Sequence, residues 1–238
     1  MLWLVEATPA DLRSLPLVRS YVQRVDEFRK TSKAESTRNY PYPTLFRQVT
    51  QPNNDFILIP GHTSENRRFI PFGFFPKDWI VGNSCFSIPD ATRFHFGVIS
   101  STMHNAWVRY TCGRLESRYR YSKDIVYNNF PWPEAPTEAQ KKKIETAAQG
   151  VLDVRAQFPE ASLADLYDPL TMPPALLKAH QQLDTAVDGA YLANGGRKSF
   201  KNDAERVAFL FELYQKYTSL LPAISPKSKQ RRQKAIAS

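Results

Sequence analysis

The predicted fold depends on residues 103–133, which read MHNAWVRYTCGRLESRYRYSKDIVYNNFPWP. The first part of this stretch has the apolar spacing of a helix, and we expect that helix to end at Gly113. After the glycine, apolar or small side chains alternate with charged ones as far as Tyr121. Because successive side chains of a strand point to opposite faces, the alternation predicts an extended segment with charges in a row on one face. The row consists of Glu116, Arg118 and Arg120.

Side chains of these types can read DNA bases. Arginine can donate two parallel hydrogen bonds to guanine O6 and N7, and glutamate can accept a hydrogen bond from cytosine N4. A row of one glutamate and two arginines is therefore suited to the edges of base pairs in a major groove. The alternative is a solvated strand face whose charges pair with those of a neighbouring strand.

Upstream of this stretch the sequence predicts short strands followed by a helix. Pro60-Gly61 ends a first apolar run, and the polar residues 61–68 separate it from an aromatic run. Gly82-Asn83 predicts a bulge or tight turn within a third strand. The strands are predicted at 55–59, 69–75 and 79–88, and the helix at 91–112.

The N-terminal part predicts a short helix followed by a basic loop. Residues 1–25 have the apolar spacing of a helix, and the polar, proline-punctuated residues 29–43 predict a loop. Lys33 and Arg38 on that loop either face solvent or contact DNA phosphates. The opening MLWLVEATP has neither a helix cap nor a glycine turn, so we expect the chain to begin partway through a larger protein.

Beyond Pro133 the pattern becomes helical. Thr137, a residue type that caps helices, precedes an Ala-rich segment that reaches Phe158. Further helices are predicted on both sides of Pro173-Pro174 and at 204–220. The predicted fold class is therefore α+β, with a mixed strand and helix domain followed by an all-helical domain.

The composition is that of a globular protein, and its net charge suits a polyanionic partner. The chain has 238 residues and a net charge of +9, which suits nucleic acid without identifying it. Residues 1–238 contain no stretch with the length of a transmembrane helix and no signal-peptide pattern at the start. Cys85 and Cys112 are too few for a disulfide framework, so we expect reduced core thiols in a cytoplasmic protein.

The sequence predicts no catalytic site and no metal site. It has no Gly-rich loop after a strand that could cradle a nucleotide cofactor, and its four histidines lack metal-ligand spacing. His104, within the predicted helix, is interpreted as a hydrogen-bonded structural residue. Asn128 and Asn129 are not followed directly by proline, so the Asn-Pro-Pro-aromatic loop of amino-methyltransferases is absent.

Three runs of sequence resemble the C-terminal part of MmeI-like type IIL restriction–modification proteins. They are IPGHTSENRRFIPFGF at 59–74, SSTMHNAWVRYTCGRLESRYRYSKDIVYNNFPWP at 100–133 and LADLYDPLTMPPALLKAHQQLDTAVDGAY at 163–191. In that family one polypeptide joins a nuclease, an adenine-N6 methyltransferase that uses S-adenosylmethionine, a target recognition domain and a helical segment. The resemblance implies that this chain contains only the last two. S-adenosylmethionine and Mg²⁺ would then belong to other parts of the parent protein, and this chain would bind no cofactor.

The resemblance also implies which residues meet DNA. Gly61 occupies a base-reading position but departs from the charged or polar residue that the family has there. Glu116 and Arg118 are expected to read one C·G pair jointly, and Arg120 with Ser84 a nearby purine. The implied base-reading residues are Gly61, Asn83, Ser84, Glu116, Arg118 and Arg120. The phosphate-contacting residues are expected to be Arg67, Arg68, Lys33 and Arg38, with pairing to acids inside the fold as the alternative for Arg67 and Arg68.

The leading hypothesis is a non-catalytic module that recognises double-stranded DNA and positions a methyltransferase and a nuclease elsewhere in the parent polypeptide. One alternative is a helical protein-interaction module. Another is non-specific RNA or single-strand binding with Tyr119, Tyr121 and Trp132 as stacking platforms, although we expect the two tyrosines to pack in the core. The predicted segments are a linker helix at 1–27, a target recognition domain at 28–133, a helical domain at 134–222 and a basic disordered tail at 223–238.

Overall fold

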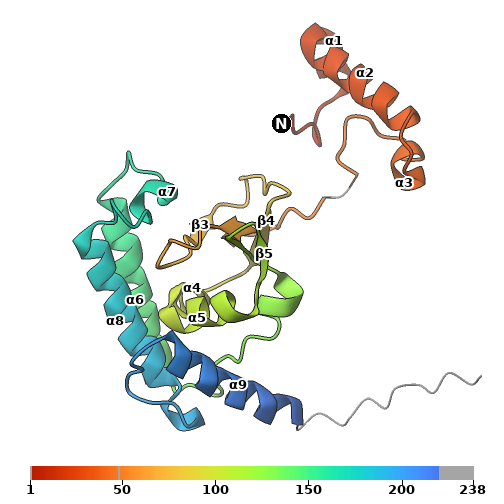
Figure 1. Ribbon diagram of the computed structural model, residues 1–238. Helices are drawn as coiled ribbons and strands as arrows, with labels where there is room; N and C mark the ends of the chain where they lie inside the picture. Colours follow the sequence, from red (N-terminus) through yellow and green to blue (C-terminus); the bar gives the residue numbers. More distant parts are fainter. Residues whose placement is uncertain (1, 48, 220–238) are drawn as a thin grey trace, which may run out of the picture. The chain divides into compact units, whose positions relative to one another are not determined.

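The computed structural model describes residues 2–47 and 49–219 (Figure 1). These residues form two compact units, one ending at Gln51 and the other beginning at Pro52. Each unit is described by itself below. The predicted tail at 223–238 lies outside the described residues.

The first unit consists of three helices and the segments that connect them. Thr8 caps the first helix in a reciprocal capping box with Asp11, and Pro16 begins the second, because proline suits the first helical position. No residue of the three helices is buried. The prediction of one short helix and a loop was wrong in part, since the second helix reaches Lys30 and a third lies within the expected loop. The helices are α1 (Pro9–Ser14), α2 (Pro16–Lys30) and α3 (Glu35–Arg38).

The second unit begins with two small antiparallel sheets. The first sheet has the strand order β3-β1-β4 and the second β2-β6-β5. The aromatic run forms a strand only at its end, because Pro71 has no backbone N–H to donate to a ladder. The third predicted strand begins only at Cys85, after a turn. The strands are β1 (Phe56–Pro60), β2 (His62–Thr63), β3 (Gly73–Phe75), β4 (Cys85–Pro89), β5 (Gly113–Leu115) and β6 (Arg118–Arg120).

Two helices, α4 (Arg93–Ser100) and α5 (Thr102–Thr111), replace the single helix predicted at 91–112. The break lies at Ser101, whose backbone is extended and whose hydroxyl accepts a hydrogen bond from the first turn of α5. Gly97 permits close packing of α4, since a Cβ there would lie 2.6 Å from Ile144 on a later helix. The π-helical turn η1 (Lys123–Tyr127) follows the second sheet.

The regular elements of the remaining described residues are all helical, as predicted. Thr137 caps α6 through a capping box with Gln140. Figure 1 shows α6 and α8 side by side, and α6 packs on α4 while α9 packs on α5. The predicted α+β class, with strands first and helices after them, is confirmed. The helices are α6 (Glu138–Ala156), α7 (Leu163–Leu166), α8 (Pro174–Ala190), the 3₁₀ turn η2 (Leu192–Asn194) and α9 (Asp203–Ser219).

One hydrophobic core runs through the second unit, from Ile57 on β1 to Leu213 on α9. The core therefore crosses the predicted boundary between residues 133 and 134, because α6 covers α4. The predicted domain boundaries at 27/28, 133/134 and 222/223 stay predictions. None of the described helices has both the length and the apolar character needed to cross a membrane.

Buried polar groups join the later helices to the segment before β3. Arg155 on α6 donates one hydrogen bond to the carbonyl oxygen of Phe72 (2.7 Å) and another to the Tyr167 hydroxyl (2.8 Å). The same hydroxyl lies 2.7 Å from Nε2 of His180, whose ring stacks on Phe69. Since buried donors and acceptors need partners, this network holds the irregular segment at 69–72 against the helices.

Candidate nucleic-acid interface

The predicted row of three charges is a hairpin and not one extended segment. Leu115 pairs with Arg118, so the chain reverses direction at Glu116-Ser117. Glu116 has a φ of 57°, a backbone conformation that favours glycine or asparagine. The prediction of a single strand through residues 114–122 was therefore wrong. The two-residue turn was missed because Glu116-Ser117 contains neither the glycine nor the asparagine that usually marks such a turn.

One side of the second sheet is exposed and carries two of the three predicted charges. Directly opposed residues of antiparallel strands share a face, and the register pairs Arg120 with His62 and Arg118 with Leu115. All four side chains are exposed. We call this surface the candidate face; it consists of His62, Leu115, Arg118 and Arg120.

The opposite side of the same sheet faces the protein. Tyr119, which lies between the two arginines in sequence, is only 8% exposed. The guanidinium of Arg114 lies 4.1 Å from the centre of its ring. Tyr121 is buried as well, and its hydroxyl lies 2.9 Å from Nε2 of His104. The predictions of buried tyrosines and of a structural role for His104 are thus confirmed.

An ion pair occupies the tip of the hairpin. Nη2 of Arg118 lies 2.7 Å from Oε2 of Glu116, and both side chains are well exposed. A second acid, Glu65, lies close by: a hydrogen bond from Ser117 lowers the pKa of its carboxyl, and Arg114 acts in the same direction. The tip therefore presents carboxylates and guanidiniums next to one another, the combination suited to the two bases of a C·G pair.

Gly61 connects the candidate face to the second predicted group of base readers. Its N–H donates to the carbonyl oxygen of Ser84 (2.9 Å), and its own carbonyl accepts from the N–H of Tyr121 (2.9 Å). Asn83 and Ser84 form the predicted tight turn before β4, and both are exposed. The turn therefore lies beside the end of β6, so the structure brings the predicted base-reading segments together.

A side chain at position 61 would disturb this junction. A Cβ built on Gly61 lies 2.5 Å from the carbonyl oxygen of Ser84, closer than real Cβ contacts come. Any larger residue at this position would therefore require the Asn83–Ser84 turn to lie farther away. In this chain, Gly61 acts by permitting close approach of two segments.

We expect Gly61→Ala to lower the free energy of unfolding by about 1–3 kcal/mol, because the turn must move to relieve the overlap. Urea unfolding measures the loss. Gly113→Ala is the matched control, since a Cβ there meets nothing within 4 Å. The control keeps the stability of the unaltered chain or slightly raises it. Equal stability of the two variants would show that the junction is not closely packed.

Arg67 and Arg68 differ in how they are held. Arg67 is half-buried, and its Nε has no hydrogen-bond partner among the described residues. Arg68 is exposed, and its guanidinium lies 5.5 Å from the centre of the Phe69 ring. Desolvation raises the pKa of the half-buried Asp184, and the charge of Arg68 acts weakly in the opposite direction. No ion pair of Arg68 with an acid occurs among the described residues, and its predicted contact with phosphate stays a prediction.

Lys33 and Arg38 lie in the first unit and are described apart from the candidate face. Both are exposed. Arg38, in the last turn of α3, donates a hydrogen bond to the carbonyl oxygen of Ser32 (2.9 Å). Their predicted contact with phosphates stays a prediction.

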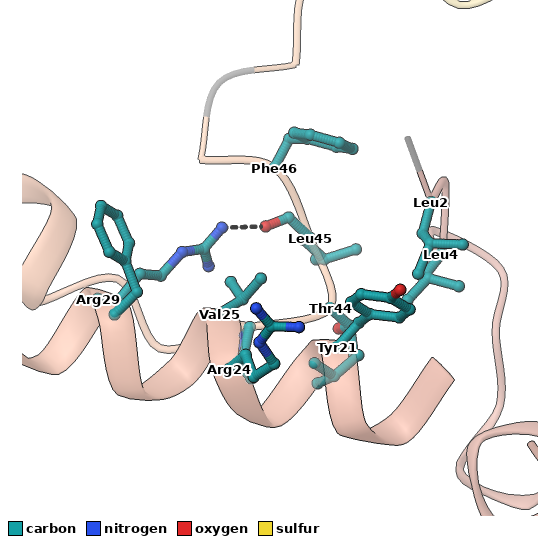
Figure 2. A pocket seen from close by; sticks show the side chains of 12 residues that line it. Leu2, Leu4, Tyr21, Arg24, Val25, Arg29, Thr44, Leu45 and Phe46 are labelled. Carbon is teal, nitrogen blue, oxygen red and sulfur yellow. Dashed lines mark hydrogen bonds between the residues drawn. The ribbon is translucent and has the colours of Figure 1, made fainter. Parts of the chain in front are cut away.

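The first unit also contains an apolar groove of about 750 Å³, which the sequence did not predict (Figure 2). Figure 2 shows Tyr21 and Val25 on α2 across from Leu45 on the segment that returns past the helix, and Phe46 on the same segment also lines the groove. Arg29 holds that segment by donating to the carbonyl oxygen of Leu45 (2.7 Å). Apolar side chains remain exposed around the groove, Phe28 to 69%.

Sequence reasoning also missed His62, which lies beside Arg120 on the candidate face. It was considered only as a metal ligand, because the pairing of β2 with β6 joins segments far apart in sequence. Among the described residues no cluster of three metal-ligating side chains is present. Cys85 and Cys112 are free thiols. Both are half-buried, so the prediction that they lie in the core was wrong. Burial raises the pKa of the Cys112 thiol.

Comparisons with known proteins agree with this geometry. The family model described as "MmeI, target recognition domain" matches residues 1–134, and "MmeI, C-terminal domain" matches residues 136–222. DNA methyltransferase A of Bacillus subtilis (strain 168) is 38% identical over 91% of this chain and 24% of its own length. The solved structure of the type IIL restriction-modification enzyme MmeI in complex with DNA is 50% identical, with a TM-score of 0.86, over 92% of this chain and 29% of that one.

The chain spans about a quarter of the length of these two relatives. The two family models together cover nearly all of the described residues, and the solved relative has the same fold. The resemblance found in the sequence is thereby confirmed. The chain belongs to the MmeI family, of which it contains a target recognition domain followed by a C-terminal domain.

Proposed function

We propose that this chain recognises a specific sequence of double-stranded DNA for a restriction–modification enzyme and that the candidate face enters the major groove. The observation that carries the proposal is the junction at Gly61, which gathers the Asn83–Ser84 turn and the arginines of β6 on one exposed surface. The 50% identity to an enzyme solved in complex with DNA supports it.

In this proposal Glu116 and Arg118 read one C·G pair, because the carboxylate accepts from cytosine N4 while the guanidinium donates to guanine. Arg120 and Ser84 read a nearby purine, and Asn83 contributes a further contact. The backbone of Glu116 supports a functional role: a non-glycine residue at a φ of 57° costs stability and tends to be kept where its side chain is used.

Other basic side chains would hold the DNA without reading it. Contacts of Arg67 and Arg68, and of Lys33 and Arg38 on the first unit, with phosphates would supply affinity that falls as salt rises. The chain itself would be non-catalytic. S-adenosylmethionine and Mg²⁺ would be bound by methyltransferase and nuclease parts of a longer polypeptide, which would function in the cytoplasm.

The exposed apolar side of α2 and the groove beside it are proposed to pack against the methyltransferase part of that polypeptide. No residue of the helices α1 to α3 is buried. The apolar side chains of Leu17, Tyr21 and Phe28 on α2 are exposed. Exposed apolar surface of this kind is typical of an interface between parts of a protein. The relatives, of which this chain spans about a quarter, are long enough to supply such a part.

Binding competition tests the proposed function. A labelled duplex selected from randomised duplexes is bound by the purified chain, and unlabelled competitors are added. We expect the selected duplex to compete far better than random duplex, and single strands to compete poorly, because Tyr119 and Tyr121 are buried and offer no stacking surface. Equal competition by random duplex or by single strands would contradict the proposal.

A matched pair of variants distinguishes side chains that recognise bases from side chains that contact phosphates. Arg67→Ala should weaken binding to all duplexes alike and reduce the slope of log affinity against log salt by about 1. Arg118→Ala should instead lower the preference for the selected duplex over duplexes changed at one base pair. If both variants weakened all duplexes equally, the candidate face would hold DNA without reading it.

A further inference from the structure

The candidate face contains a side chain with no role in the proposed recognition. His62 belongs to the edge strand β2, and its partner in register is Arg120 on β6. On the other side of Arg120 the paired residue is Gly113, which has no side chain, and nothing fills the space above it. Of the two residues paired with Arg120, His62 and Gly113, only His62 places a side chain beside that of Arg120.

His62 also lies between the two groups of proposed base readers. Gly61, the residue before it, is hydrogen-bonded to Ser84 on one side and to Tyr121, the residue after Arg120, on the other. A DNA major groove that contacts both groups of proposed base readers must therefore lie over His62. This position distinguishes His62 from Arg67 and Arg68, which lie outside the strands of the sheet.

The imidazole side chain is available for contact. It is exposed, and no hydrogen bond or ion pair of this side chain occurs among the described residues. A neutral imidazole has one N–H donor and one nitrogen acceptor. Neighbouring strands lie about 4.8 Å apart and base pairs about 3.4 Å, so a side chain beside Arg120 reaches a neighbouring base pair.

We propose that His62 is a specificity-determining residue that donates a hydrogen bond to a purine in the base pair next to the one read by Arg120. The acceptor is N7 of the purine, or O6 where the purine is guanine. This inference rests on the proposed function, since it requires that the candidate face enters the major groove.

Selection from a randomised duplex pool tests the inference with the full 238-residue chain. The enriched sequences are compared for the unaltered protein, His62→Ala, His62→Gln and Arg120→Ala. We expect His62→Ala to lose preference at one base pair by about five- to tenfold, next to the base pair at which Arg120→Ala loses preference. His62→Gln should shift the preference at that base pair toward adenine, because a carboxamide bonds adenine N6 and N7 together.

The possible failures are distinguishable. If the unaltered protein enriches no sequence, the proposed function is overturned and this inference with it. If it enriches a sequence and His62→Ala enriches the same one at every position, only the role of His62 is overturned. A uniform loss of affinity in His62→Ala and His62→Gln, without a change of preference, would assign His62 to a phosphate and also overturn the inference. Circular dichroism checks that each variant is folded. If His62→Ala is not folded, the preference of His62→Gln alone decides whether His62 reads a base.

Discussion

Exchanging the charges at the hairpin tip, by Glu116→Lys together with Arg118→Asp, should change the base pair preferred at one position and leave the other positions unchanged. The arginine that donates to guanine and the glutamate that accepts from cytosine are replaced by groups of opposite sign. Each lost contact should cost about 1–3 kcal/mol of discrimination. The two side chains pair with each other at 2.7 Å and are exposed, so the exchanged pair can still form and the hairpin should fold.

The measurement is the preferred sequence of the exchanged variant, determined by selection from randomised duplexes. Glu116→Gly provides a matched control for folding. Glycine accepts a φ of 57° without strain, so this variant should be at least as stable as the unaltered protein while losing preference at the same base pair. A variant of Glu116 that gains stability and keeps its full preference would show that the carboxylate reads no base.

The largest effect on stability should come from acid. His104 and His180 are buried, and desolvation by burial lowers the pKa of each imidazole from 6.5 to about 3. Between these two pH values the unfolded chain binds protons that the folded chain does not, so stability is lost as the pH falls below 6.5. Each histidine should contribute a loss of about 1.4 kcal/mol per pH unit in this range.

Acids whose pKa is raised by burial act in the opposite direction. Burial raises the pKa of Asp188 from 3.8 to about 6, although Arg206 lies 3.0 Å away and favours the charged form. Below pH 6 the folded chain therefore gains a proton that the unfolded chain takes up only near pH 4, which adds stability as the pH falls. Asp184, whose pKa burial also raises, acts in the same direction as Asp188, so the net slope of the unaltered protein is smaller than the sum of the two histidine contributions.

Urea unfolding at several pH values between 6.5 and 4.5 measures these slopes. His104→Gln and His180→Gln should each reduce the loss by about 1.4 kcal/mol per pH unit, and the double variant by the sum, since the two sites belong to separate hydrogen-bond networks. The difference in slope is the informative quantity, because both substitutions also lower stability at neutral pH. A slope unchanged in both single variants would show that these histidines are protonated in the folded protein.

The sequence by itself determined the class of the fold, the change from strands to helices after Pro133 and the family. Local features carried this information: the helical spacing from Thr137 onward, the turn at Gly82-Asn83 and the runs that resemble MmeI-like proteins. The alternation around Tyr119 and Tyr121 also predicted correctly that these rings are buried. Each feature is read from neighbouring residues, and the physical preferences behind it act over a few residues.

Only the tertiary structure decided the shape of the candidate face. The hairpin at Glu116 lacks a turn signal, so its positive φ must be held by strand pairing and not by local preference. The pairing of β2 with β6, which places His62 beside Arg120, joins residues nearly sixty positions apart. The close approach at Gly61 depends likewise on Ser84 in the turn before β4. These arrangements result from contacts between distant segments that fill one core, and no local pattern of the sequence specifies them.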